Sequence, residues 1–476
     1  MRVLSRGLFL SLLTSSMAVS MLDAGTWSQF RGPNASGRPE RELPLPESVG
    51  PDTNLVWKTA LPPGHSSPAV FGDQIFVTTA DKGQLSTVAI DRRTGSVQWE
   101  AAAPHEKLEE IHNIGSHAQP SPATDGERVV SFFGSAGLFC YDTAGKPLWN
   151  IPMGPFKNDF GAGSSPILVD DRVILCQDHD TDSFLMAIDK RTGKPLWKTD
   201  RSEFPRNYCT PVIWNVEGRK QIVVAATLRI AAYDFDDGHE LWTVRGVARI
   251  VNMTPTVGED GILYVACWSP GGDEKDRISA APFADIIAAH DANGSGTIEK
   301  DEAPEGPIRQ RFSQIDRDKD GRIVTEEYES MRRVFENAHN VVMAIKPGGT
   351  GDITDTHVLW KYRKVIPYCP SPLCYRGRVY MIKDGGILTV LDAATGKPLK
   401  EGRIKATGGY YSSPVAGDGK VYLLSQRGEL TILSADDDFR ELSTTDLGEN
   451  GFATPAIVDG RIYVRTSSHL YCFARP

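Results

Sequence analysis

The stretch AIDKRTGKPLW, Ala187 to Trp197, contains a strand that ends in Asp, a turn with Gly, and a strand that ends in Trp. In an Asp-x-x-x-Gly turn, the Asp side chain bonds to nearby backbone and the Gly takes a positive φ. The same pattern returns in AIDRRTGSVQW (89–99), YDTAGKPLW (141–149) and AYDFDDGHELW (232–242). This repetition predicts a series of similar β-units in which each Trp supplies apolar surface between neighbours.

A Ser/Thr-Pro dipeptide opens each of these units. Most spacings between the prolines are 41 to 45 residues, one is 54 and one is 117. The eight copies are Ser67-Pro68, Ser121-Pro122, Ser165-Pro166, Thr210-Pro211, Thr254-Pro255, Ser371-Pro372, Ser413-Pro414 and Thr454-Pro455. Four short strands per unit at this period predict an all-β fold, an eight-bladed β-propeller.

The last unit is incomplete, because the chain ends soon after Thr454-Pro455 without a Trp-bearing strand. A suitable strand, NLVWKTALP (54–62), precedes the first Ser-Pro copy. We expect this N-terminal strand to complete the eighth blade and close the ring, because closure removes two open sheet edges.

Two segments inside the 117-residue gap have the spacing of EF-hand calcium loops: DANGSGTIEKDE (291–302) and DRDKDGRIVTEE (316–327). Such loops supply oxygens from positions 1, 3, 5, 7, 9 and 12, with Gly at 6. The expected metal ligands of the first loop are Asp291, Asn293, Ser295, the carbonyl of Thr297, Glu299 through a water, and Glu302. Those of the second are Asp316, Asp318, Asp320, the carbonyl of Arg322, and Glu327.

The sequence therefore predicts two bound Ca²⁺ ions. We expect the second loop to bind more tightly, because it has four ligand carboxylates. Ile298 and Ile323 hold position 8, where paired EF-hands join by a short β-bridge. Apolar residues at helical spacing flank the loops and predict a small α-helical EF-hand pair inserted in blade five. An acidic surface turn is the alternative for one loop alone.

The chain divides into five expected parts: a signal peptide (1–24), an N-terminal arm (25–53), a first propeller part (54–269), the EF-hand pair (270–339) and a second propeller part (340–476). Arginines followed by the apolar stretch LFLSLLTSSMAVSML predict export, and hence a periplasmic or secreted protein with no membrane span after signal removal. A net charge of -9 gives no electrostatic reason to bind nucleic acid. The seven cysteines form no CxxC, so a zinc site is unsupported.

The repeat resembles that of the pyrroloquinoline-quinone-type propellers, over residues 54–476 apart from the calcium loops. That superfamily includes quinoprotein alcohol dehydrogenases and the non-enzymatic propeller lipoprotein of the bacterial outer-membrane assembly machine. WSQFRGPNASG (27–37) also resembles the leader segment of exported bacterial proteins with this propeller. We expect that segment to be an ordered arm packed on the propeller.

The resemblance implies two possible functions. One is a non-enzymatic binding or scaffold protein with a protein or polysaccharide partner. The alternative is a quinoprotein dehydrogenase, whose family members stack the quinone between a Trp and an adjacent-cysteine disulfide and hold calcium with Glu, Asn and Asp. No two cysteines are adjacent here, which disfavours pyrroloquinoline quinone as a cofactor. We find no GxSxG, HExxH or P-loop motif and therefore assign no catalytic residue.

A candidate binding site follows from the propeller topology. The chain crosses one face of the disc just before each Ser/Thr-Pro, so the residues there should surround the mouth of the central channel. Three places before each proline stand His65, Gln119, Gly163, Tyr208, Asn252, Cys369, Tyr411 and Phe452, with His117 and Tyr368 close by. Aromatic and hydrogen-bonding side chains suit a small ligand or peptide. The alternative is that they only pack the channel.

Overall fold

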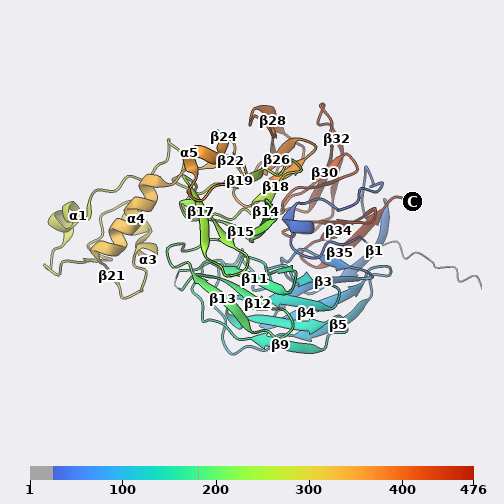
Figure 1. Ribbon diagram of the computed structural model, residues 1–476, viewed down its shortest axis with the longest axis horizontal. Helices are drawn as coiled ribbons and strands as arrows, with labels where there is room; N and C mark the ends of the chain where they lie inside the picture. The colour runs from blue at the N-terminus through green and yellow to red at the C-terminus, as the bar shows by residue number, and fades with distance from the viewer. Residues whose placement is uncertain (1–24, 181) are drawn as a thin grey trace, which may run out of the picture.

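The computed structural model describes residues 25–180 and 182–476. Their strands form eight blades around a ring, with a group of helices to one side (Figure 1). The strands of blades one to four, from the channel outward, are β2 (Ala69–Phe71), β3 (Gln74–Asp81), β4 (Gln84–Asp91), β5 (Val97–Ala102); β6 (Ala123–Thr124), β7 (Arg128–Phe132), β8 (Leu138–Asp142), β9 (Pro147–Ile151); β10 (Ile167–Val169), β11 (Arg172–Gln177), β12 (Phe184–Asp189), β13 (Pro195–Asp200); and β14 (Val212–Val216), β15 (Arg219–Ala226), β16 (Arg229–Asp234), β17 (Glu240–Arg245).

Blades five to eight follow the same order. Their strands are β18 (Thr256–Val257), β19 (Leu263–Cys267), β22 (Val341–Ile345), β24 (Val358–Tyr362); β25 (Leu373–Tyr375), β26 (Arg378–Lys383), β27 (Ile387–Asp392), β28 (Pro398–Arg403); β29 (Val415–Gly417), β30 (Lys420–Leu424), β31 (Glu429–Ser434), β32 (Glu441–Asp446); and β33 (Ala456–Val458), β34 (Arg461–Arg465), β35 (His469–Ala474), β1 (Leu55–Ala60). The eighth blade thus combines the last three strands with the N-terminal β1, and the expected closed propeller is confirmed.

The Ser/Thr-Pro dipeptides hold the ring together at its centre. In every copy the Ser or Thr hydroxyl accepts a hydrogen bond from the backbone N–H of the equivalent residue in the preceding blade. The donor and acceptor pairs are Ser67 to Ser121, Ser121 to Ser165, Ser165 to Thr210, Thr210 to Thr254, Thr254 to Ser371, Ser371 to Ser413, Ser413 to Thr454 and Thr454 to Ser67, at 2.9–3.1 Å. The bonds form a closed circle, which explains why a short hydroxyl side chain recurs there.

We expect Ser165→Ala to lower the free energy of unfolding by about 1–3 kcal/mol, because it leaves the buried N–H of Ser121 without its acceptor. Ser164→Ala is a matched control, since Ser164 is equally buried and its hydroxyl has no hydrogen-bond partner among the described residues. Denaturant unfolding of both variants measures the difference. Equal destabilisation would show that the circle of hydrogen bonds adds nothing at this position.

Five blade-end Trp residues pack on the turn of the next blade, whereas the indole of Trp242 donates to Gln221 Oε1 of its own blade at 2.8 Å. The indole of Trp149 donates to the Lys190 carbonyl at 3.0 Å, and a Cβ on Gly193 would lie 2.8 Å from its ring. The same fit joins Trp57 to Gly95, Trp99 to Gly145, Trp197 to Gly238 and Trp360 to Gly396. The Gly therefore serves both the positive φ of the turn and the close approach of the indole.

Residues 25–53 bond to inner strands of the propeller and to turns between first and second strands, which lie on the face opposite the Ser/Thr-Pro crossings. Trp27 pairs with Val70 of β2, and the side chain of Asn34, in the 3₁₀ turn η1 (Pro33–Ala35), bonds to both backbone groups of Ile213. Arg31 donates to the Pro372 carbonyl at 2.7 Å. Because the arm bonds to blades one and two and to blades four to eight, it is an ordered part of the propeller.

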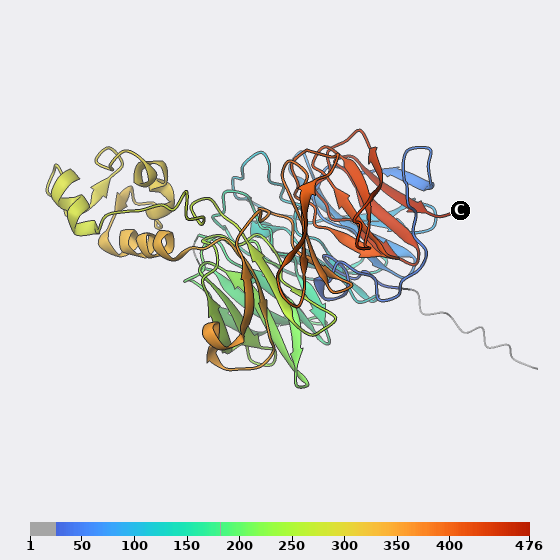
Figure 2. The same cartoon turned by 90° about the horizontal axis from the view of Figure 1, so that it is seen from above.

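The helical insertion leaves blade five between β19 and β22. It comprises α1 (Phe283–His290), β20 (Ile298–Glu299), α2 (Pro307–Gln310), α3 (Phe312–Ile315), β21 (Arg322–Ile323) and α4 (Thr325–Asn337). Ser269 and Asn340 close its neck through two hydrogen bonds, from the Ser269 N–H to Asn340 Oδ1 at 2.8 Å and from Asn340 Nδ2 to the Ser269 carbonyl at 3.1 Å. Seen from above, the insertion projects beyond the rim of the propeller (Figure 2).

One element was not expected from the sequence. The connection between β22 and β24 carries β23 (Gly351–Asp352) and α5 (Thr354–His357), and β23 pairs parallel with β17 as a fifth strand of blade four. A second 3₁₀ turn, η2 (Gly134–Ala136), lies in blade two. The expected signal peptide, 1–24, lies outside the described residues. None of the helices that the structure describes is long and apolar enough to cross a membrane.

Candidate functional site: the channel mouth and the EF-hand pair

The residues expected at the channel mouth lie around one cavity of about 250 Å³. All eight residues three places before the prolines line it, and all eight are half-buried, whereas the residue after each is buried. This alternation follows from extended backbone, which points successive side chains to opposite sides. Tyr368 also lines the cavity. His117, which was expected nearby, is not among the described residues that line it.

Aromatic rings form much of the cavity wall. The imidazole of His65 stacks on the ring of Phe452 with centroids 4.1 Å apart, and Tyr411 lies 5.4 Å from Phe452. Across the cavity, Tyr208 packs edge-on against Phe160 at 6.4 Å. Burial and the charge of Arg465 lower the pKa of His65 to about 4. His65 is therefore a neutral, stacking imidazole at neutral pH.

Polar groups in the wall are held in fixed positions. The Tyr208 hydroxyl donates to Asn158 Oδ1 at 2.7 Å, and Asn252 Nδ2 donates to the Tyr368 carbonyl at 3.2 Å. Gln119 Nε2 donates to the Phe160 carbonyl at 2.8 Å. These contacts orient the side chains before any ligand arrives, which reduces the entropic cost of binding.

The N-terminal arm meets the inner part of the cavity. Phe30 of the arm lines it, and the arm bonds to residues two places after several of the prolines. Mouth and arm are thus separated by about five residues of extended strand, roughly 16 Å. The mouth is a cavity on the face where the chain crosses between blades, and we use the name cup for it below.

Sequence reasoning missed three kinds of cup residue. Ile114 and Gly115 come from the long connection between blades one and two, and Phe160 from the connection between blades two and three. The 54-residue spacing between the first two prolines signals that the first connection is long. Phe30 carries no such signal, because only the folded arm brings it to the channel.

The residues that line the cup do not match those that the resemblance implies for holding pyrroloquinoline quinone. Of the described residues that line the cup, none is a Trp, Asp or Glu, and Asn252 is the one match to the implied calcium ligands. All seven cysteines lie within the described residues, and each is a free thiol.

The EF-hand pair shows the geometry of calcium loops. In each loop the position-12 Glu accepts N–H bonds from positions 2 and 9, and the position-1 Asp accepts from the position-6 Gly. In the second loop, carboxylate oxygens of Asp316, Asp318 and Asp320 all lie within 4.8 Å of one another. The residues present therefore fit a hard cation, because the N–H groups turn the carboxylates toward one centre.

The two loops are joined as expected. Ile298 pairs with Ile323 in the antiparallel bridge β20–β21, and both side chains are fully buried. Their core also contains Phe283, Phe312 and Tyr328 from the flanking helices. This shared core makes the pair one small helical unit within the blade.

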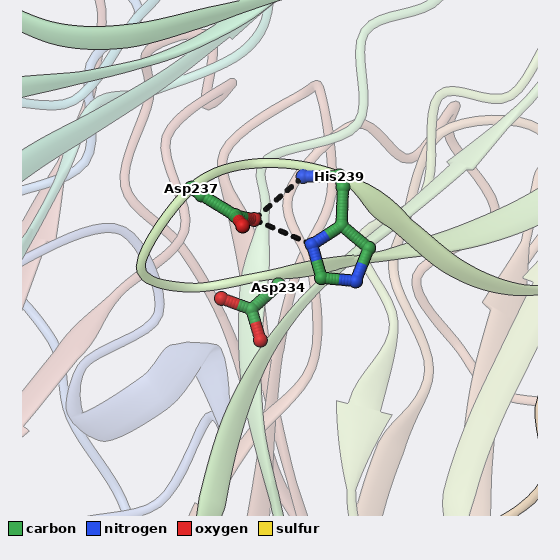
Figure 3. Close-up of side chains that lie close together, drawn as sticks. All are labelled: Asp234, Asp237 and His239. Carbon is green, nitrogen blue, oxygen red and sulfur yellow. Dashed lines mark hydrogen bonds and ion pairs between the residues drawn. The ribbon is translucent and has the colours of Figure 1, made fainter.

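A third cluster of candidate ligands lies on the turn between β16 and β17 (Figure 3). His239 Nδ1 lies 2.5 Å from Asp237 Oδ1, and Asp234 is beside them. Asp234 Oδ1 already accepts the Asp236 N–H at 2.8 Å, as its equivalents do in other blades. Turn formation accounts for this arrangement, and we assign no metal to it.

These features define an eight-bladed propeller of pyrroloquinoline-quinone-type repeats with an EF-hand pair built into one blade. A family model described as outer membrane protein assembly factor BamB matches residues 50–153, 87–267 and 327–475, and the chain belongs to that family. An EF-hand family model matches residues 308–331, which hold the second loop. No curated protein matches the chain.

Solved structures show the same fold at low sequence identity. BamB from Moraxella catarrhalis is 14% identical, with a TM-score of 0.55 over 88% of this chain and 99% of that one. A europium-containing methanol dehydrogenase is 11% identical, with a TM-score of 0.50 over 95% of this chain and 98% of that one. The computationally designed protein Ika8 is 11% identical, with a TM-score of 0.55 over 89% of this chain and all of the other.

Proposed function

We propose that this protein is an exported, calcium-binding propeller that acts as a non-enzymatic binding or scaffold protein, with the cup as its binding site. The observation that carries the proposal is the cup itself, a preformed cavity with aromatic walls. Rigid rings with polar edges bind ligands at low entropic cost. The apolar N-terminal stretch and its arginines support export to the periplasm or beyond.

We propose a protein as the partner. The family description, an assembly factor, supports this choice over a polysaccharide. A cavity of about 250 Å³ can hold one or two side chains of a partner loop but not a folded surface. The remaining contacts would come from the rim around the cup. Two Ca²⁺ ions, one in each loop of the EF-hand pair, complete the proposed functional protein.

The test replaces Tyr208, Tyr368 and Tyr411 with Ala together. We expect capture of partners from periplasmic extract to fall by about tenfold or more, because buried aromatic anchors dominate such interfaces. A control variant changes Val97, Leu148 and Leu196 to Ala; these are exposed on the outer strands and far from the cup.

Melting temperatures separate loss of binding from loss of folding. Because the Tyr208 hydroxyl bonds to Asn158, the matched Phe variants, which keep the rings, are measured beside the Ala variant. Unchanged capture by a folded triple-Ala variant would remove the cup as the binding site.

A further inference from the structure

A second cavity lies between the EF-hand pair and the propeller. Its volume is about 380 Å³, and its walls come from both parts. The insertion contributes α3, the second calcium loop and α4, and the propeller contributes the connections before blades four and five and the loops β11–β12 and β15–β16. Arg317 Nη2 donates to the Ser202 carbonyl at 3.2 Å across one end. We call this cavity the hinge cleft. Its lining residues are Asp180, Ser202, Glu203, Pro205, Arg206, Thr227, Arg249, Ile250, Gln314, Arg317, Lys319, Glu327, Ser330, Met331 and Val334.

The hinge cleft lies on the same face as the cup. Arg206 precedes the cup residue Tyr208 by two positions, and Arg249 precedes Asn252 by three. The insertion connects the second and third strands of a regular four-stranded blade, so it emerges on the face where the chain crosses between blades. Trp268, at the neck of the insertion, packs edge-on against Tyr368 of the cup at 5.4 Å.

The acidic residues of the hinge cleft are already engaged. Asp180 accepts two hydrogen bonds from Arg206, at 2.8 and 2.6 Å. Glu203 pairs with Arg229 at 2.5 Å. Glu327 is the position-12 residue of the second calcium loop, and its oxygens accept the N–H groups of that loop. None of these carboxylates is left to balance a further cation.

Three cationic side chains of the hinge cleft are bonded to carbonyl groups and not to carboxylates. Arg249 Nε donates to the Pro270 carbonyl at 3.1 Å, Arg317 donates to the Ser202 carbonyl, and Lys319 donates to the Ser313 carbonyl. No carboxylate of the described residues forms an ion pair with any of the three. Burial, which disfavours the charged form, lowers the pKa of Arg249 to about 10, and the charge of Arg311 adds to this shift. Arg249 and Arg317 are half-buried and Lys319 is exposed. Unpaired cations that line one cavity favour a negatively charged ligand.

The rest of the hinge cleft combines four apolar side chains with four polar ones, which are Ser202, Thr227, Gln314 and Ser330. Ile250 and Pro205 face it from the propeller, and Met331 and Val334 from α4. No aromatic side chain is among the described residues that line it, whereas sugar rings are commonly bound by stacking on such rings. Methionine adapts well to the side chains of a peptide. The lining therefore suits carboxylates interspersed with apolar side chains better than it suits an acidic sugar.

We propose that the hinge cleft binds an acidic peptide segment of a partner protein, with its carboxylates on Arg249, Arg317 and Lys319 and its apolar side chains on Ile250, Met331 and Val334. This site is separate from the cup, and its test does not use the partner of the cup. The proposal for the hinge cleft can therefore be wrong while the proposal for the cup is right, and the reverse also holds.

Calcium in the second loop should strengthen this binding. Arg317 and Lys319 occupy positions 2 and 4 of that loop, so the loop conformation places both cations. Calcium also offsets two of the four negative charges that Asp316, Asp318, Asp320 and Glu327 bring close to the cleft. Because coupling between two sites is reciprocal, the peptide must tighten calcium binding by the same factor.

The experiment measures fluorescence anisotropy of a labelled peptide, EELEELEE, on the full chain, in calcium and in chelator. We expect binding in calcium to be about fivefold tighter than in chelator, within the usual range of coupling between sites. The double variant Arg249→Gln with Lys319→Gln should lower the affinity for the peptide by about tenfold. The control pair is Arg93→Gln with Lys397→Gln, which removes the same charge from exposed turns of blades one and six and should change affinity by less than about twofold.

Three outcomes would overturn the proposal. Equal weakening in both double variants would mean that binding follows net charge alone. Binding of the neutral peptide QQLQQLQQ with the same affinity would remove the role of the carboxylates. Tighter binding of oligogalacturonate than of EELEELEE would assign the cleft to an acidic sugar. Far-ultraviolet circular dichroism of each variant confirms folding, and Lys319→Gln alone serves if the double variant is unstable, because Lys319 is exposed.

Discussion

Deletion of residues 54–62 is expected to prevent folding to a soluble monomer. Trp57 is 9% exposed, and the loss of a buried Trp side chain alone costs about 3–5 kcal/mol. The deletion also removes the β1–β35 ladder and the bond from the Trp57 indole to the Arg92 carbonyl in blade one. The sum approaches the whole stability of a typical domain, about 5–15 kcal/mol.

The deletion protein is expected to aggregate because β1 closes the propeller ring. Without β1, β35 has an unpaired edge, and a hydrophobic edge strand pairs readily with other molecules. The measurement is size-exclusion chromatography of the deletion protein after expression. A soluble monomer with a cooperative thermal transition near that of the intact chain would contradict the role of β1.

Removal of the insertion provides the control for this deletion. Cys267 of β19 and Val341 of β22 are paired directly, and Ser269 and Asn340 close the neck. Replacement of residues 270–339 by a short Asn-Gly turn should therefore leave blade five intact. The control removes more chain than the deletion of residues 54–62 and should still give a folded propeller.

The ring could be predicted from the sequence because the repeated residues have the same task in most blades. The hydroxyl of Ser165 accepts an N–H, Gly193 admits the indole of Trp149, and Asp189 accepts the N–H groups of its own turn. The Ser/Thr hydroxyl bond recurs in all eight blades and the Trp–Gly fit recurs five times. Such recurrence leaves a periodic pattern, and the pattern locates the crossings and therefore the cup. The calcium loops were predictable for a similar reason, because ligand geometry dictates the residue at each position.

Features that occur once left no such pattern. The pairing of β23 with β17, the position of Phe30 under the cup, and the contact of Arg317 with Ser202 each depend on how a long connection folds. Arg249 is typical: its position before Thr254-Pro255 places it near the mouth, but only the docked insertion makes it part of the hinge cleft. Packing between segments distant in sequence decides such sites.

Calcium titration of the full chain is expected to show two sites, the tighter one in the second loop. That loop provides four ligand carboxylates, whereas the first provides Asp291 and Glu302 directly. Glu327→Gln should weaken the tighter site by about 100-fold, because it removes the bidentate carboxylate that completes the coordination. Glu302→Gln should affect only the weaker site. Isothermal titration calorimetry measures both, and Asp301→Asn, an exposed acid outside the ligand positions, is the control.

The same ions should stabilise the insertion and not the propeller, because every expected ligand lies between residues 291 and 327. At a free calcium concentration 100 times the dissociation constant, the gain for the unit that binds is about 2.7 kcal/mol per site. Limited proteolysis in chelator should therefore cut within 270–339 first and leave the blades intact, and calcium should suppress those cuts. Absence of binding heat at millimolar calcium, or a calcium-dependent shift of the propeller transition in the protein that lacks the insertion, would contradict the assignment of the ions to these loops.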